Sequence, residues 1–326
     1  MAGFKKKAGF GRQSEKNQLH TNRRAEEVTD SELKRLIEDR ENQDELFAFA
    51  DAVRRKNFGT EVQLRGLVEI TNYCKNNCYY CGIRKDNAHI ERYRLTKDII
   101  TECCKKGYAS GLRTFVLQGG EDSCFTDSRI CEIIASIKES CPGCIVTLSI
   151  GEKSYESYLA YKNAGADRFL LRHETADAGL YSLLHPKSMS FEHRRQCLRD
   201  LKSIGFGVGS GFMIGAPFQT AEHIVRDFRF LQELKPDMIG VGPYITQKDT
   251  PLCMHKSGSL DLSLRVLALL RIMFPKALIP ATTALGTVAE NGRERGLKAG
   301  ANVIMHNISP LEFRRQYALY DGKSPL

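Results

Sequence analysis

The chain has 326 residues, 42% of them hydrophobic, which suffices for one large barrel or two domains of medium size. No run reaches the roughly 18 apolar residues of a membrane span, and no apolar secretion segment follows the start, so we expect neither secretion nor a membrane partner. The net charge of +9 is mostly local, because residues 1–24 carry +6 of it. The nearly neutral remainder argues against a nucleic-acid partner.

The N-terminal segment 1–28 is basic, and we expect it to be disordered. A basic stretch with so few acidic residues could also be an organelle-targeting segment, and that alternative stays open. The eleven cysteines, an odd number, fit reduced thiols better than a disulfide framework. The sequence therefore predicts a cytoplasmic protein.

From residue 29 the pattern becomes helical, because apolar residues recur every three or four positions. Leu33 and Ile37 mark a first helix and Leu46 a second, both within residues 29–58. Asp30 or Ser31 is the expected N-cap of the first helix.

Residues 59–326 alternate short β-rich runs with amphipathic helical stretches. Eight strands are expected, at 62–71, 114–118, 145–150, 168–171, 207–214, 238–241, 278–282 and 302–305. Helices are expected between them, at 96–108, 128–140, 155–164, 191–203, 220–234 and 260–274. This alternation predicts an α/β fold with a parallel sheet, and eight units fit a TIM-type (β/α)8 barrel with an N-terminal helical extension. Active sites of such barrels lie at the C-terminal ends of the strands.

A loop with three cysteines directly follows the first expected strand. Cys74, Cys78 and Cys81 have the spacing Cys-x3-Cys-x2-Cys, which offers three thiolates to a metal centre. A 4Fe–4S cluster held by three cysteines keeps one iron open for a ligand, whereas structural zinc and electron-transfer clusters usually take four protein ligands. A zinc knuckle is the alternative, but His89 lies outside the usual zinc-finger spacing.

Polar residues and glycines follow the next expected strands. Gly119 and Gly120 would let backbone groups come close to a ligand at the end of the second strand. Glu152, after the third strand, could accept hydrogen bonds from a ribose or an amine. Arg172, after the fourth, could pair with a carboxylate. Their recurrence at successive strand ends predicts one site at this face of the barrel.

The loop, in which the aromatic Tyr80 precedes the third cysteine, resembles the signature of the radical S-adenosylmethionine (SAM) superfamily. The resemblance implies a 4Fe–4S cluster on Cys74, Cys78 and Cys81 and a SAM cofactor that is cleaved to a 5′-deoxyadenosyl radical. It also implies that the main chain of a Gly-Gly-Glu segment holds the amino group of SAM and that a Gly-x-Ile-x-Gly segment lies along the adenine. The matching residues in this chain are Gly119, Gly120, Glu121 and Ile214.

Longer strings resemble the HydE family of FeFe-hydrogenase maturation enzymes, from about residue 28 to 323. They include residues 72–78, 81–87, 166–175, 280–287 and 299–305. Within that family, Glu152 and Arg172 match positions associated with SAM. Positions that line the barrel interior and bind anionic substrate groups match Arg65, Gln118, Thr282, Thr283 and Tyr317.

The HydE resemblance implies a part in assembling the di-iron subcluster of the hydrogenase. It implies a small cysteine-derived or iron-bound substrate and possible partners among the other maturases, HydG and HydF. Two alternatives stay open: a radical SAM mutase or lyase on a small amino acid, like methylornithine synthase, and a non-catalytic iron–sulfur scaffold. Cys141 and Cys144 also have Cys-x2-Cys spacing, but they precede a strand, and we expect them to be small, partly buried residues.

Overall fold

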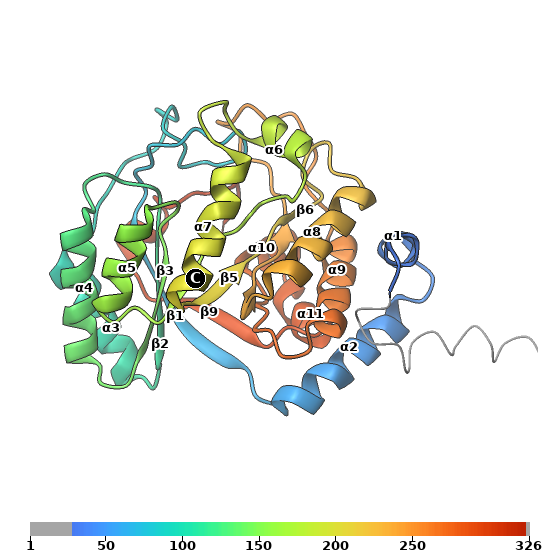
Figure 1. The fold of residues 1–326 in the computed structure, drawn as a ribbon, viewed down its shortest axis with the longest axis horizontal. Helices are drawn as coiled ribbons and strands as arrows, with labels where there is room; N and C mark the ends of the chain where they lie inside the picture. The colour runs from blue at the N-terminus through green and yellow to red at the C-terminus, as the bar shows by residue number, and fades with distance from the viewer. Residues whose placement is uncertain (1–27, 324–326) are drawn as a thin grey trace, which may run out of the picture.

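A computed structural model describes residues 28–323 (Figure 1). The predicted tail therefore lies outside the described residues, apart from its last position, as does the possible targeting segment. The helices are α1 Asp30–Glu38, α2 Gln43–Phe58, α3 Lys97–Ala109, α4 Asp127–Ser140, α5 Tyr155–Asn163, α6 Ala178–Leu184, α7 Phe191–Ile204, α8 Ala221–Leu234, α9 Leu260–Met273, α10 Thr283–Val288, α11 Gly292–Lys298 and α12 Leu311–Arg314. The strands are β1 Gln63–Thr71, β2 Thr114–Gly119, β3 Ile145–Ser149, β4 Arg168–Leu170, β5 Gly207–Ser210, β6 Met213–Ile214, β7 Met238–Ile239, β8 Gly242–Pro243 and β9 Val303–Asn307.

Seven parallel strands form the main sheet in the order β7-β5-β4-β3-β2-β1-β9. The segment 278–281 joins the two outer strands, because Leu278 bridges to Met238 of β7 and Pro280 bridges to Val303 of β9. Backbone hydrogen bonds reinforce both joints, at 3.0 Å from Ile239 N to Leu278 O and 2.9 Å from Ala281 N to Val303 O. The predicted α/β fold of the TIM-barrel type is therefore confirmed.

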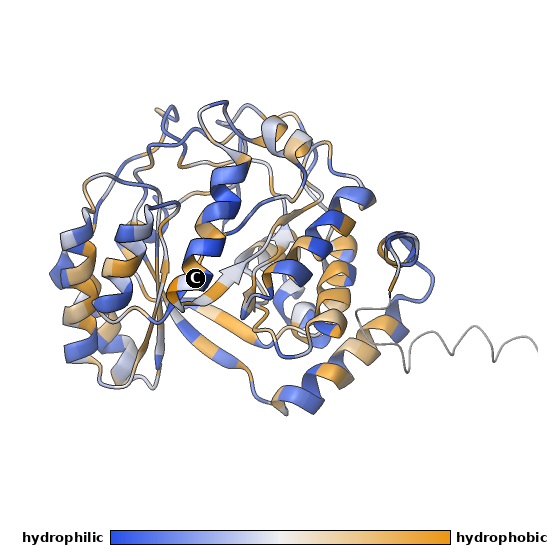
Figure 2. Ribbon diagram, in the orientation of Figure 1, coloured by the Kyte–Doolittle hydropathy of each residue, from blue (hydrophilic) through white to orange (hydrophobic). Residues whose placement is uncertain are grey.

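The helices pack around the sheet with their apolar faces inward, as the colours of Figure 2 show for α3, α4 and α5. One apolar core lies between β1–β5 and helices α3, α4, α5 and α7, around residues such as Phe115, Ile134 and Phe169. A second core joins α8 and α9 to the N-terminal helices, with Leu33 and Leu267 among its buried residues. The two N-terminal helices thus pack on helices α8, α9 and α11 of the barrel.

Three expectations need correction. The first helix is capped by Thr29, not by Asp30 or Ser31, because Glu32 completes a reciprocal capping box with Thr29. The fifth predicted strand is broken into β5 and β6 near Gly211, whose backbone approaches Gly240 so closely that a Cβ would lie 1.9 Å from the Gly240 carbonyl oxygen. The seventh predicted strand makes single bridges only.

Among residues 28–323, no helix combines the length and the apolar character that crossing a membrane requires.

Candidate active site

The cysteine loop lies at the C-terminal end of β1, as its place in the sequence predicts. It rests on the turn after β2, because Lys75 N donates to the Glu121 carbonyl at 2.8 Å. Gly120 makes this contact possible, since a Cβ there would lie 2.2 Å from Tyr73 O and 2.7 Å from the Cys74 Cβ. The glycine is therefore required for the approach of two backbones at the cluster loop.

The three thiols are partly buried and none forms a disulfide. Burial raises the pKa of Cys74 and of Cys78, and it raises the pKa of Cys81 to about 12. A metal centre supplies the positive charge that stabilises the thiolates, so binding would release their protons. In the described part of the chain, no three Cys, His, Asp or Glu side chains converge on one metal-ion position. A 4Fe–4S cluster does not need such convergence, because each cysteine binds a different iron.

Tyr80, next to the third cysteine, is hydrogen-bonded to a buried histidine. His185 Nδ1 lies 3.0 Å from the Tyr181 carbonyl, which can only accept, so Nδ1 carries the proton. Burial, helped by Arg194, lowers the pKa of His185 to about 3, so the ring is neutral and its Nε2 accepts. The Tyr80 hydroxyl, 3.1 Å away, therefore donates to Nε2 and fixes the aromatic residue of the cysteine motif.

The Gly-Gly-Glu turn after β2 is buttressed by the turn after β3. Glu121 is buried and accepts a hydrogen bond from Glu152 N at 2.9 Å. Gly151, at φ 78°, leaves room for this carboxylate, because a Cβ there would lie 2.1 Å from the Glu121 Cγ. Lys75 Nζ lies 3.2 Å from the other oxygen of Glu121. Gly119, Gly120, Glu121 and Glu152 are thus brought to one edge of the barrel.

Arg172 carries the clearest ligand-binding signal of the site. Its Nη2 lies 3.2 Å from Glu174 Oε2, yet Nε and Nη2 are buried and make no hydrogen bond to the protein. Buried donors without acceptors cost about 1 to 3 kcal/mol. The guanidinium thus keeps hydrogen-bonding capacity that the protein does not use, although its charge is already paired with Glu174. Glu174 itself has a positive φ of 66°, the kind of backbone strain found at functional sites.

Arg194 of α7, which the sequence did not single out, links these two strand ends. It pairs with the Glu152 carboxylate and donates to the Arg172 carbonyl at 2.8 Å. Burial acts to lower its pKa, but the Glu152 carboxylate together with Tyr181 and Tyr80 outweighs burial, so the pKa is raised. Arg194 and Glu174 are also near enough to Cys78 to affect its pKa, so this charged group adjoins the cysteine loop.

A buried polar chain supports the Arg172 turn from behind. His173 Nδ1 lies 2.9 Å from Ser210 Oγ and His173 Nε2 lies 3.2 Å from Asp227 Oδ1. Asp227 also accepts from the Ala176 backbone N–H. All three side chains are buried, and their hydrogen bonds fix the turn between β4 and α6.

Ile214 lies in β6, where its carbonyl accepts from Tyr244 N at 2.8 Å. A Cβ on Gly258 would lie 2.3 Å from that carbonyl oxygen, so the segment is closely packed against the loop between β8 and α9. The side chain is fully buried, which leaves the backbone for any adenine contact.

The five predicted substrate residues are not all together. Gln118 Nε2 lies 3.4 Å from the Tyr317 hydroxyl, near the C-terminal strand ends. Thr282 caps α10 and Thr283 begins it, directly after the seventh predicted strand, and the buried Thr282 hydroxyl has no partner. Arg65 lies apart, at the opposite end of β1, where Nη1 contacts the Met238 sulfur at 3.1 Å and Nε and Nη2 are unpartnered. Its cavity is only about 10 Å³, lined by Val116, Thr147, Leu170 and Met238 among others.

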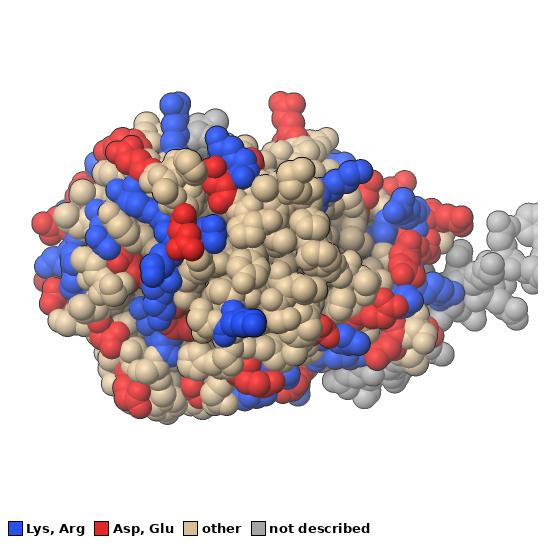
Figure 3. Space-filling model, turned by 90° about the horizontal axis from the view of Figure 1, so that it is seen from above, with Lys and Arg blue, Asp and Glu red and all other residues tan. Residues whose placement is uncertain are grey.

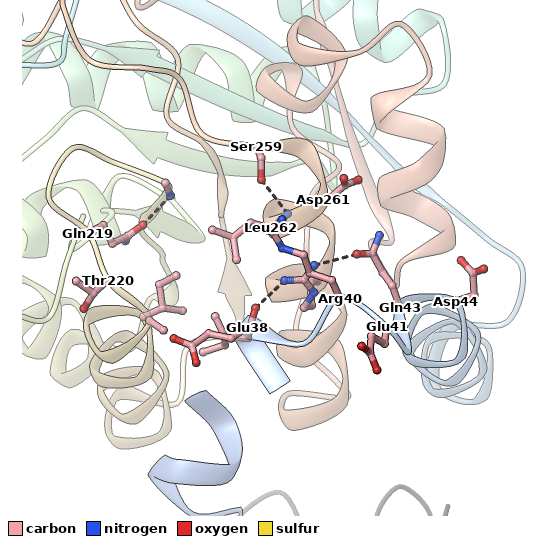
Figure 4. Close-up of a pocket in the computed structure, with 15 residues that line it drawn as sticks. Glu38, Arg40, Glu41, Gln43, Asp44, Gln219, Thr220, Ser259, Asp261 and Leu262 are labelled. Carbon is pink, nitrogen blue, oxygen red and sulfur yellow. Dashed lines mark hydrogen bonds between the residues drawn. The ribbon is translucent and has the colours of Figure 1, made fainter. Parts of the chain in front are cut away.

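A much larger groove, of about 710 Å³, lies outside the barrel between the N-terminal helices and α8–α9 (Figure 4). Charged side chains of both signs line it, including Glu38, Arg40 and Asp261. Its buried cation, Arg265, already donates to Ile37 O at 2.7 Å and to Gln43 Oε1 at 3.0 Å. Arg265 therefore anchors the N-terminal helices to α9, and the groove reaches the strand ends only at Gly215, next to Ile214.

The strand-end face is seen from above in Figure 3, which shows uncharged side chains at its centre and charged ones around them. Exposed apolar side chains on segments of this face include Leu183 of α6, Phe218 after β6 and Met254. The mouth of the barrel is thus bordered by apolar as well as charged groups.

Comparison with known proteins matches residues 68–231 to the Radical SAM superfamily, which is 164 of the 326 residues. The chain is also 47% identical over 287 residues to the FeFe-hydrogenase maturase subunit HydE of Thermotoga maritima, covering 88% of this chain and 82% of that protein. It is 32% identical to the 3-methylornithine synthase of Methanosarcina acetivorans, covering 85% and 79%. The crystal structure of methylornithine synthase is similar, with a TM-score of 0.80, 31% identity, and 88% and 85% covered.

The chain therefore belongs to the radical SAM superfamily, whose members use a 4Fe–4S cluster and SAM. Within it, the chain belongs to the HydE family. The predicted cofactors are thus confirmed at the level of the family, while the individual contacts of Glu152, Arg172 and Ile214 with SAM remain predictions.

Proposed function

We propose that this protein is a HydE-type maturase, which cleaves SAM reductively and acts in assembling the di-iron subcluster of an FeFe hydrogenase. The observation that carries this proposal is the 47% identity to HydE over 287 residues, which extends well beyond the 164 residues of the superfamily core. The 4Fe–4S cluster supplies the electron that converts SAM to methionine and the 5′-deoxyadenosyl radical.

In this proposal, different residues of the chain would bind the cluster and the parts of SAM. Cys74, Cys78 and Cys81 hold the cluster, and the unpartnered donors of Arg172 receive the SAM carboxylate. The backbone of Gly119 and Gly120 accommodates the SAM amino group, and Ile214 lies along the adenine. The enclosed barrel excludes water from the reactive centre, which prevents side reactions of a radical.

The substrate would be a small anionic, cysteine-derived molecule carrying iron, delivered by a partner maturase such as HydG or HydF. The support from this structure is the buried, unpartnered Thr282 hydroxyl and the Gln118–Tyr317 pair near the strand ends. A guest carboxylate at Thr282 would satisfy a donor that the protein leaves unpaired. Arg65 would serve an anionic group only if the guest reaches the opposite end of the barrel.

A second candidate is a mutase or lyase on a small amino acid. The 32% identity to 3-methylornithine synthase and the TM-score of 0.80 with its structure favour this reading. The cysteine loop and the Gly-Gly-Glu turn would serve both reactions equally. The two candidates therefore differ only in the guest that the barrel interior accepts.

The test is anaerobic reconstitution followed by two assays. The first measures 5′-deoxyadenosine formed from SAM with a reductant, with and without a cysteine-derived iron complex. The second measures activation of an apo-hydrogenase with the other maturases present. We expect SAM cleavage and hydrogenase activation. SAM cleavage that yields a rearranged amino acid and no active hydrogenase would favour the mutase, and the absence of SAM cleavage would leave only a scaffold.

A further inference from the structure

Residues 316–323, here called the strap, run across the mouth of the barrel after α12. On one side the strap is bonded to the cysteine loop, because Gly82 N donates to Leu319 O at 2.8 Å. The contact is close, since a Cβ on Gly82 would lie 2.0 Å from Ala318 O. Just before this loop, Asn72 Nδ2 donates to Gln316 O at 2.8 Å.

On its other side the strap is bonded to the loop that follows β8. Asp321 N donates to Thr246 O at 3.1 Å, and Lys248 N donates to Asp321 Oδ2 at 2.9 Å. The strap thus bridges the cysteine loop and the loop after β8, which also contact each other, because Leu252 N donates to Tyr79 O at 3.2 Å.

The last described residue of the strap enters the barrel. Lys323 Nζ donates to Glu69 Oε1 at 2.6 Å, and both side chains are almost completely buried. Glu69 lies on β1 beside Gln118 of β2, and its second oxygen accepts from Asn307 Nδ2 at 3.0 Å. Both oxygens of the Glu69 carboxylate therefore have a hydrogen-bond partner, and of the two partners Lys323 is the one that carries a positive charge.

The same lysine also holds Tyr317. Lys323 Nζ donates to Tyr317 O at 3.0 Å and lies 4.9 Å from the centre of the Tyr317 ring. The Tyr317 hydroxyl faces Gln118 Nε2 at 3.4 Å. The ammonium thus connects the strap, the barrel wall and one of the predicted substrate residues.

We propose that Lys323 is a positioning residue, whose ion pair with Glu69 latches the strap over the barrel mouth and holds Tyr317 beside Gln118. A buried charge that loses its partner is strongly unfavourable, so the pair favours the closed strap over a partly lifted one. The strap must lift to admit a guest and close again before the radical forms. This functional role rests on the proposed function, whereas the latch itself does not.

The test is amide hydrogen exchange of the full chain after anaerobic reconstitution. In Lys323→Met and in Glu69→Gln, we expect exchange at least tenfold faster in the strap and at Gly82, with no change in β3 and β4. The variant that combines Lys323→Met with Glu69→Gln should exchange no faster than either single variant. Each single substitution already removes the ion pair, so the second one removes nothing more. Lys323→Arg should restore slow exchange. Lys248→Met, which removes an exposed lysine beside the strap but keeps its backbone bond, should behave as wild type.

Unchanged strap exchange in either single variant would overturn the latch, and so would an equal increase in β3 and β4, which indicates general destabilisation. Glu69→Gln keeps the shape of the side chain and provides the test if Lys323→Met does not accumulate. A second measurement tests whether the latch closes the strap during the reaction. For each hydrogenase activated, the Lys323→Met variant should form severalfold more 5′-deoxyadenosine than the wild-type protein, at an unchanged KM for SAM. An unchanged ratio would reject the role in closure. If wild-type protein activates no hydrogenase, the proposed function fails, and the exchange result still decides the latch.

Discussion

Two groups of three cysteines lie toward opposite ends of this barrel, and we assign only one of them to the proposed active site. Cys74, Cys78 and Cys81 follow β1 at the C-terminal strand ends, and they are partly exposed. The other group is Cys104 of α3 with Cys141 and Cys144, which precede β3 and are fully buried. Burial raises the thiol pKa in both groups, so the pKa alone does not distinguish them.

The surroundings make the difference. The first group adjoins Arg194, Glu174 and the unpartnered donors of Arg172, whereas the second packs among apolar residues such as Ile137. A Cys-x2-Cys spacing occurs in both. The comparison teaches that position at the strand ends, with charged groups around it, identifies the reactive thiols more reliably than spacing does.

The largest expected effect separates the two groups directly. Cys74→Ala, Cys78→Ala and Cys81→Ala should each abolish cluster binding, because no other thiol lies in that loop to replace the lost ligand. Cys141→Ala should keep a full cluster. Iron and sulfide content and the visible absorbance after reconstitution measure this. Loss of iron in Cys141→Ala with retention in Cys78→Ala would reverse the assignment.

The next effect concerns the substrate, within the active end of the barrel. Changing Thr282 and Thr283 together to Val keeps their shape but removes two hydroxyls, which would leave a buried anion short of partners by about 1 to 3 kcal/mol each. We expect normal cluster content and SAM cleavage without substrate, but no hydrogenase activation.

Thr287→Val is the matched control, because Thr287, like Thr283, contacts the Tyr320 side chain and lies one helical turn further from the start of α10. It should activate hydrogenase normally. Full activation by the double variant would exclude this pair from the substrate site.

A smaller effect is expected when arginines at the two ends of β4 are substituted. Arg172→Ala should weaken SAM binding about 10- to 100-fold, as expected for the loss of a charge-assisted hydrogen bond of roughly 1.5 to 3 kcal/mol. Arg168→Ala removes a guanidinium from the start of β4 and should leave SAM affinity unchanged. Equilibrium binding of SAM to the reconstituted protein provides the measurement, and equal affinities in the two variants would contradict the assignment.

The smallest effect belongs to the buried group. Cys104→Ala should lower the free energy of unfolding by about 1 kcal/mol, the typical size for a core substitution. Denaturant unfolding, followed by circular dichroism, measures the change. Iron content should stay at the wild-type level. A loss of iron would show that these buried thiols take part in cluster binding and would contradict the distinction between the two groups.

Much of the site could be predicted because parallel strands bring their C-terminal ends together. The places of Cys74, Gly120, Glu152 and Arg172 followed from chain order alone. Arg194 could not be found this way, because it lies on a helix with an ordinary amphipathic pattern and reaches Glu152 only through tertiary packing.

Glu69 and Lys323 were missed for a related reason. A charged residue at an inward position of a buried strand was the available signal for Glu69, but its partner lies 254 positions further along the chain. The break between β5 and β6 depends on contact with Gly240, which local sequence does not show. The sequence therefore predicts the residues whose position follows from the order of the strands. It does not predict features that depend on contacts between residues far apart in the chain.

The most direct measurement of the central claim is the electron paramagnetic resonance spectrum of the reduced cluster with and without SAM. Three cysteine ligands leave one iron open, so we predict that SAM changes the spectrum of the wild-type protein. Cys141→Ala should show the same change, and Arg172→Ala should need a higher SAM concentration to reach it. A wild-type spectrum that is identical with and without saturating SAM would contradict the account.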